Sequence, residues 1–203
     1  MDAGGGTLML IVCAEVALVE AELVGGLLLC PSCRGVLGPW GHARERVTRR
    51  GSGDWRWRPR RARCRGCRGT HVLLADACLL RRQDEVEVIG RAVEAHVAGE
   101  GHRAIAARLG VPAGTVRGWL RRFEANAEVI RGFFTRCAVT LDPELGPIMP
   151  AGGGAAEALE AIGVAGRAWV LRFGSRPVWR IVSRLSAGGL LVRNTSSLAT
   201  RAW

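Results

Sequence analysis

The sequence contains CPSC at residues 30–33 and CRGC at residues 64–67, two pairs of cysteines that each enclose two residues. A structural zinc site needs four soft, deprotonated ligands at the corners of a tetrahedron, and two such turns supply four sulfurs aimed at one point. A complete shell of four cysteines leaves no open position for a catalytic water. The spacing therefore predicts a structural Zn²⁺ site formed by Cys30, Cys33, Cys64 and Cys67. The alternative is a ribbon of reduced thiols that has lost its metal.

Other histidines and cysteines lie near or beyond these pairs. His42 and His71 are spare ligands close to the pairs, and each is expected to be an ordinary surface or hairpin residue. Cys13, Cys78 and Cys137 have no partner at ligand spacing, so they are expected to be thiols of the core.

Positive charge is concentrated between and around the cysteine pairs. The 203-residue chain has a net charge of +11 and contains no lysine, so arginine carries all of its basic charge. Residues 44–68 hold eleven arginines and two acids, a net charge of +9. A GC-rich genome would explain part of the arginine excess but not its position. Arginine binds phosphate and guanine in a bidentate manner, so the cluster indicates a nucleic-acid-binding surface.

The arginine-rich run is predicted to form a β-hairpin over residues 43–64, with GSGD at 51–54 as its turn. Trp55 and Trp57 alternate with arginines, which places the tryptophans on one face of a strand and the arginines on the other. The candidate phosphate contacts in this ribbon are Arg56, Arg58 and Arg60.

The apolar run TLMLIVC at residues 7–13 is too short to cross a bilayer and has no basic residue before it. It is predicted to be a buried strand, followed by a helix at 14–26, and residues 70–80 complete this first unit. Because no export signal is recognised, we expect a cytoplasmic, nucleoid-associated protein with reduced cysteines and no membrane partner.

A helix-turn-helix pattern follows the cysteine region. Residues from 84 onward have helical periodicity, and a short helix at 102–110 precedes a longer one at 112–134. Ala106 is small where two helices would cross, and Gly110 suits the turn between them. The residues expected to contact DNA from the second helix are Ala113, Gly114, Thr115, Arg117, Gly118, Arg121 and Arg122. The alternative is an ordinary three-helix core with solvated arginines.

The C-terminal part is predicted to be a Pro/Gly linker at 141–154 and a helical tail at 155–203. Two amphipathic helices are expected in the tail, with an irregular end. Their apolar faces are too large to remain in water as isolated helices, so they should pack on the first unit or form a homodimer. The residues of these faces are Leu159, Ile162, Trp169, Leu171, Val178, Trp179, Val182 and Leu185.

The motifs CPSC, RRARCRGCRGTH and IAARLGVPAGTVRGWL resemble the N-terminal region of insertion-sequence transposases, over roughly residues 8–135. The chain is most similar to a family of small proteins from high-GC bacteria that carry only this region. The resemblance implies that the four paired cysteines bind zinc and that the helix from Pro112 to Phe123 binds DNA. The transposases continue into a nuclease domain with three carboxylates that hold two Mg²⁺ ions. No matching carboxylate pattern follows Phe123, so we expect no enzyme and no small-molecule substrate.

These observations predict an α+β fold with a zinc β-ribbon domain at 1–83 and a homeodomain-like helix-turn-helix domain at 84–135, ahead of the linker and tail. The predicted function is sequence-selective binding of double-stranded DNA, as a transcription regulator or a mobile-element accessory factor. The alternatives are a protein-interaction module that docks a recombinase or another partner, and a transposase-derived remnant. Binding of duplex DNA with and without the tail would separate the first two of these readings.

Overall fold

The first part of the chain forms a four-stranded sheet in a computed structural model that describes residues 8–148 and 152–192. Its strands, in the order β1-β6-β5-β2, are β1 (Leu8–Val12), β6 (Thr70–Ala75), β5 (Arg60–Cys64) and β2 (Leu37–His42). β1 runs parallel to β6, and the other neighbours are antiparallel. The predicted strand at 7–13 and an α+β fold are confirmed, although Thr7 lies outside the described residues.

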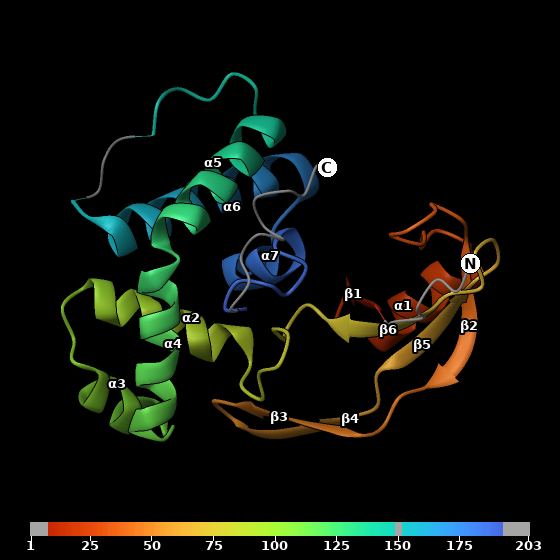
Figure 1. Ribbon diagram of the computed structural model, residues 1–203, viewed down its shortest axis with the longest axis horizontal. Helices are drawn as coiled ribbons and strands as arrows, with labels where there is room; N and C mark the ends of the chain where they lie inside the picture. Colours follow the sequence, from red (N-terminus) through yellow and green to blue (C-terminus); the bar gives the residue numbers. More distant parts are fainter. Residues whose placement is uncertain (1–7, 149–151, 193–203) are drawn as a thin grey trace, which may run out of the picture.

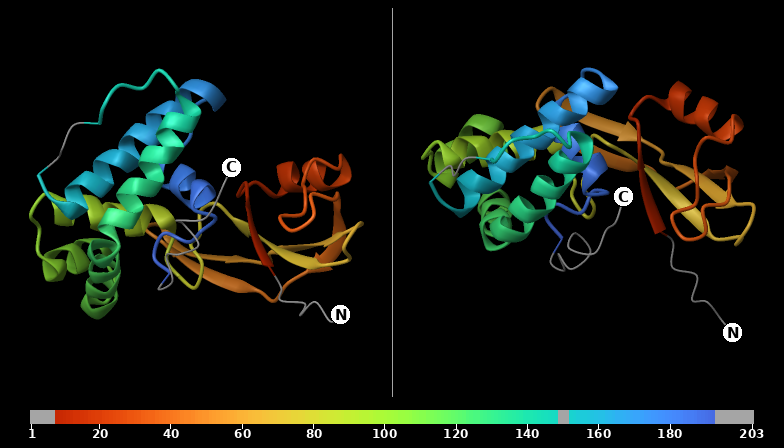
Figure 2. Two further views of the ribbon diagram at one scale, coloured as in Figure 1. Left: turned by 45° about the horizontal axis from the view of Figure 1, so that its top comes forward. Right: turned by 90° about the horizontal axis from the view of Figure 1, so that it is seen from above.

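Helix α1 (Val16–Val24) lies against one face of this sheet, as Figure 2 shows, in agreement with the helix predicted at 14–26. Alternation along β5 places Ala62 and Cys64 in the core, while the intervening Arg63 points to the opposite face. The small core of this part is built from Val12, Cys13, Val19, Leu23, Cys30, Leu37, Ala62, Cys64 and Leu73.

The hairpin is shorter than predicted from the sequence. β3 (Arg46–Arg50) and β4 (Gly53–Trp57) form a separate two-stranded sheet, whereas residues 60–64 belong to the four-stranded sheet. Pro59 has no amide hydrogen and ends the second arm before β5 begins. The backbone of Arg49 exchanges hydrogen bonds with Gln83 and Glu85, so the hairpin extends from the sheet to the helical part (Figure 1).

Three helices follow the sheet: α2 (Val86–Val97), α3 (His102–Leu109) and α4 (Ala113–Ala125). Gly110 ends α3 in the left-handed conformation, at φ 64°, where a glycine avoids the steric cost of a side chain. The single long helix predicted for 112–134 is wrong, because the chain breaks at Asn126 before α5 (Ala127–Leu141). The Asn126 side-chain amide donates a hydrogen bond to the Arg122 carbonyl, which competes with continuation of the helix.

The helices α6 (Gly154–Phe173) and α7 (Val178–Leu185) complete the helical part, with α6 packed along α5 and α7 placed between α2 and β1 (Figure 1). One hydrophobic core runs from Leu79 to Leu191 and joins these helices to α2–α4 across the predicted linker, of which residues 149–151 lie outside the described part. The tail helices therefore pack mainly on the helical part, whereas the sequence predicted packing on the first unit or a homodimer; α7 also contacts the first unit at β1. Leu171 departs from its predicted apolar face, since it is 83% exposed. Residues 193–203, predicted to be irregular, also lie outside the described part.

A buried ion pair joins the sheet to the last helix. Asp76 follows β6 and is fully buried, and its Oδ2 lies 2.6 Å from Arg176 Nη1 and 3.4 Å from Arg184 Nε. Burial raises the pKa of Asp76 above its usual value, and the nearby Arg184 and Arg176 oppose that rise. Removal of one partner from such a pair is destabilising, because it leaves an uncompensated buried charge. This contact therefore fixes α7 against the end of β6.

Among the described helices, none has the length and apolar character needed to cross a bilayer.

The close approach of α2 and α7 at Gly90 provides a test of this packing. A Cβ at Gly90 would lie 2.2 Å from the indole of Trp179, which is 4% exposed. Gly90→Ala should therefore lower the free energy of unfolding by about 1–3 kcal/mol through overpacking. Urea denaturation measures this change. The matched control is Gly163→Ala in α6, where the nearest atom is Arg167 Nη1 at 3.6 Å, and it should stabilise by up to about 1 kcal/mol. Equal stability of the two variants would contradict the docking of α7 on α2.

Candidate metal centre and nucleic-acid interface

The four cysteines predicted to bind zinc come together at one end of the sheet. Their sulfur atoms all lie within 4.8 Å of one another, including pairs at 3.4 Å (Cys33–Cys64) and 3.7 Å (Cys30–Cys67). Cys30 and Cys64 are buried, while Cys33 and Cys67 are exposed. The cluster is thus formed half by the core of the ribbon and half by its surface.

Two equivalent backbone turns hold the sulfurs. The amide of Cys30 donates to the carbonyl of Gly35, and the amide of Cys64 donates in the same way to Gly69. Arg34 and Arg68 follow the second cysteine of each turn and have positive φ angles of 61° and 65°. A Cβ at Gly35 would lie 3.0 Å from the Cys64 sulfur, so the close approach of the two turns requires a glycine there.

The donor set fits a structural zinc ion. A tetrahedron with Zn–S bonds of about 2.3 Å has edges of about 3.8 Å, near the sulfur separations in this cluster. Hydrogen bonds from the Gly35 amide and then from Cys64 lower the pKa of Cys33 to about 6. The Gly69 amide acts in the same direction on Cys67, but the sulfurs of Cys33, Cys64 and Cys30 raise the pKa of Cys67 to about 11. Four thiolates so close together repel one another unless a cation compensates them, and Zn²⁺ bound by these cysteines would supply that charge.

His71 differs from its predicted role as a surface or hairpin residue, because its side chain is only 2% exposed. Its Nε2 lies 3.4 Å from the Cys30 sulfur, and its Nδ1 is buried without a hydrogen-bond partner among the described residues. The ring can donate to the Cys30 thiolate and orient it beside a metal. Its position after β5 and the second cysteine pair was the only sequence signal for this contact. His42 is exposed, as expected, and Cys13, Cys78 and Cys137 are buried core thiols.

Helix α4 buries one side and exposes another. Val116, Trp119, Leu120 and Phe123 face the core. Of the residues predicted to contact DNA, Gly114, Arg117 and Arg121 are exposed, and the others are partly buried: Ala113, Thr115, Gly118 and Arg122. Arg122 Nη1 donates to the Gly118 carbonyl at 2.7 Å, so its guanidinium lies along the helix. The exposed arginines therefore stand at the second helix of a helix-turn-helix, where base contacts are made.

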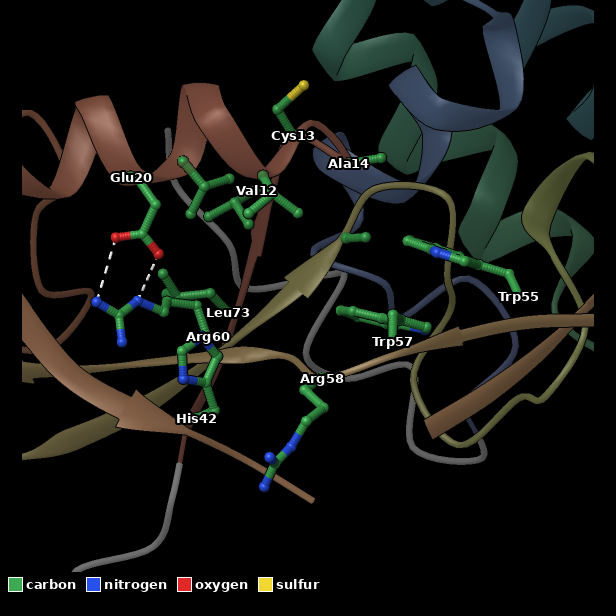
Figure 3. A pocket seen from close by; sticks show the side chains of 13 residues that line it. Val12, Cys13, Ala14, Glu20, His42, Trp55, Trp57, Arg58, Arg60 and Leu73 are labelled. Carbon is green, nitrogen blue, oxygen red and sulfur yellow. Dashed lines mark hydrogen bonds and ion pairs between the residues drawn. The ribbon is translucent and has the colours of Figure 1, made fainter. Parts of the chain in front are cut away.

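The three predicted ribbon contacts have different surroundings. Arg58 is exposed, and Arg56 is exposed beside Glu45, with 3.4 Å between Arg56 Nη1 and the Glu45 carboxylate. Arg60 forms an ion pair with Glu20 of α1 (Figure 3). It also donates to the carbonyl of Gly41, so its guanidinium is already engaged. Arg58 is thus the freest of the three predicted phosphate contacts.

A small cavity of about 50 Å³ lies between α1 and the hairpin (Figure 3). Trp55 and Trp57 line it, with stacked rings whose centroids are 4.7 Å apart, as their common strand face predicts. Arg50 covers the other side of Trp55 at 3.9 Å. The tryptophans therefore support the hairpin from its inner side.

A family model described as a homeodomain-like domain matches residues 84–129, which contain α2–α4 and the start of α5. This match agrees with the helix-turn-helix predicted from the sequence and suggests DNA binding. No curated protein and no solved structure matches the chain, so its similarity to transposases rests on the motifs alone.

The zinc site leads to a direct test. The purified protein should contain one equivalent of zinc, and Cys64→Ser should lose it together with much of the stability of the ribbon, because metal binding contributes folding energy. Elemental analysis and thermal unfolding with and without a chelator measure both effects. Cys13→Ser is the control, since Cys13 is buried but lies outside the cluster, and it should retain the metal. Equal zinc contents in wild type and Cys64→Ser would refute the assignment.

Proposed function

We propose that the protein binds double-stranded DNA in a sequence-selective manner, with α4 placed in the major groove. The observation that carries this proposal is the pair Arg117 and Arg121, exposed four residues apart on the second helix of a homeodomain-like unit. Side chains at this spacing lie on one face of a helix. Arginine makes bidentate contacts with the O6 and N7 atoms of guanine.

The zinc ribbon would act as the second half of this DNA-binding protein. Residues 84–126 contain six arginines and six acids, so this segment is formally neutral and would bind phosphate weakly by itself. Residues 44–68 carry the +9 charge that attracts a polyanion. In this proposal the ribbon gives affinity for any duplex, and α4 selects the sequence.

The role that fits this arrangement is a transcription regulator or a mobile-element accessory factor, acting in the cytoplasm on the nucleoid. A shell of four cysteines favours a structural metal, so we propose no nuclease or other catalytic activity.

The second candidate function is a protein-interaction module, supported by the exposed apolar residues Leu171 and Phe173 on α6. A transposase-derived remnant remains the third reading, and absence of any DNA binding would favour it.

Arg117→Ala tests sequence selection by α4. Loss of a bidentate guanine contact should weaken binding to the preferred duplex by about 1–3 kcal/mol and have little effect on random DNA. Titrations with a duplex selected from a random pool and with a scrambled duplex measure both affinities. Arg131→Ala is the control. It removes the same positive charge as Arg117→Ala, but from α5, where Arg131 pairs with Glu128. Equal weakening on both duplexes would show that α4 is only a basic surface.

We propose in addition that the tail mediates a homodimer through the C-terminal end of α6. Leu171 and Phe173 are 83% and 58% exposed there, beside an apolar hollow of about 320 Å³ lined by Trp169 and Leu185. A dimer would fit two DNA half-sites about one helical turn apart.

Leu171→Glu should convert this dimer to a monomer, because burial of an unpaired carboxylate in an apolar interface is costly. Sedimentation of the full-length protein measures the mass. Val24→Glu, on the equally exposed α1, is the control and should leave the mass unchanged. A wild-type monomer at all concentrations would refute the dimer without affecting the proposed DNA binding.

A further inference from the structure

The sheet has a second face that α1 does not cover. β5 turns Ala62 and Cys64 toward α1, so Arg61 and Arg63 lie on the opposite side. The described residues after α7 lie over this side near β1, where a Cβ at Gly188 would lie 3.0 Å from Ile11. We name the part formed by β5, β2 and the cysteine turns, on which no described helix packs from this side, the open face. Its residues are Arg34, Trp40, Arg61, Arg63, Arg65 and Arg68.

Internal contacts order the side chains of the open face. The Arg63 guanidinium lies 4.5 Å from the centre of the Trp40 ring, and Arg63 Nε donates to the carbonyl of Arg68. Arg65 lies over β2 at Gly38, where a Cβ would be 3.6 Å from Arg65 Nε. Trp40 remains 49% exposed although it is a large aromatic residue. Arginines beside an exposed tryptophan are a combination found at nucleic-acid surfaces.

The charge of the open face is not compensated within the described part of the chain. Arg49, Arg50, Arg56 and Arg60 each pair with an acid, respectively Asp84, Glu85, Glu45 and Glu20. The five arginines of the open face form no ion pair with a described acid, and Arg61 Nε is buried without a hydrogen-bond partner. The open face therefore holds the larger share of the unpaired positive charge of the ribbon, while Arg44, Arg46 and Arg58 at the hairpin also form no ion pair with a described acid.

Backbone strain also marks two of these positions. Arg34 and Arg68 occupy the left-handed region, which glycine enters freely and a residue with a Cβ enters at a cost. Both cysteine turns place an exposed arginine there, one residue after the second cysteine. The zinc centre would thus hold two exposed guanidinium groups, those of Arg34 and Arg68, on neighbouring turns.

We infer that the open face is a second DNA-binding surface, which contacts the phosphate backbone of the duplex read by α4. This inference rests on the proposed function and deepens it. Figure 1 shows the cysteine end of the sheet and α4 toward opposite ends of the molecule, so the two surfaces would contact separate segments of one duplex. Arginine forks bind phosphate oxygens in a bidentate manner, and Trp40 packs against the sugar.

The test removes charge without straining the fold. In the triple variant Arg34→Gly, Arg65→Gln, Arg68→Gly, two substitutions place glycine where φ is positive, so the turns should fold at least as well as in wild type. The slope of log K against log salt should fall by about 0.9 for each lost phosphate contact, up to about 2.7 for three. Dissociation constants for selected and scrambled duplexes should rise by the same factor. Hydroxyl-radical footprinting should show that protection is lost on one flank of the site and retained at the α4 contact.

The control variant Arg131→Gln, Arg167→Gln, Arg172→Gln removes the same charge from α5 and α6 and should keep the wild-type slope and footprint. Zinc content, measured for each variant, reports whether the cysteine turns are intact. Trp40→Ala is a further variant of the open face, and it leaves the sequence of both cysteine turns unchanged. A wild-type protein that binds no duplex would overturn both this inference and the proposed function. A wild-type protein that binds DNA, with the triple variant and the control behaving alike, would overturn only the open face and favour an acidic protein as its partner.

Discussion

The ribbon depends on four sulfur atoms that lie within 4.8 Å of one another. They join the turn before β2 to the turn between β5 and β6, which are distant in sequence. The hydrophobic core beside them is small, and much of the sheet edge is exposed. A cluster of thiolates alone is repulsive, so a bound cation would convert it from a source of instability into the strongest cross-link of the N-terminal part. Such a cross-link would reinforce the backbone pairing that sets the register of β2 against β5, and with it the direction of the arginines on β5.

The sheet and the helices form one structural unit because polar contacts bridge them at two places. The hairpin pairs with residues 83–85 ahead of α2, and Arg49 forms a two-pronged ion pair with the buried Asp84. On the other side, the buried Asp76 binds Arg176 and Arg184, one just before α7 and one within it. Such contacts require specific partners and add directional restraint to the hydrophobic core. A duplex held by both parts would therefore meet two surfaces in a fixed relative orientation.

Local sequence signals predicted the elements of the fold and much of the site. Contacts between distant residues explain part of where the structure differs from those predictions. The two cysteine pairs and the spacing from Ala106 to Gly110 are local patterns, and both the cysteine cluster and the homeodomain-like match agree with them. The hairpin ended early at Pro59, and the long helix broke at Asn126, because single residues outweighed the average propensity of each stretch. His71 was predicted to be a surface or hairpin residue. Its burial follows from the pairing of Ala62 with His71 across β5 and β6, which periodicity in one strand cannot show.

The same limit explains why a count of arginines along the sequence does not show which of them are paired with a carboxylate. Formal charge adds every guanidinium equally, but an arginine paired with a carboxylate contributes little to the field that a phosphate experiences. Glu20 lies forty residues before Arg60, and Asp84 lies thirty-five residues after Arg49, so the arginine-rich window at 44–68 contains neither carboxylate. When these pairs are removed from the sum, most of the remaining positive charge lies on the strand face opposite α1 and on the two cysteine turns, and a smaller part lies at the hairpin on Arg44, Arg46 and Arg58. The zinc centre would then determine where the unpaired arginines stand, so metal binding and attraction of DNA would be linked through the same short turns.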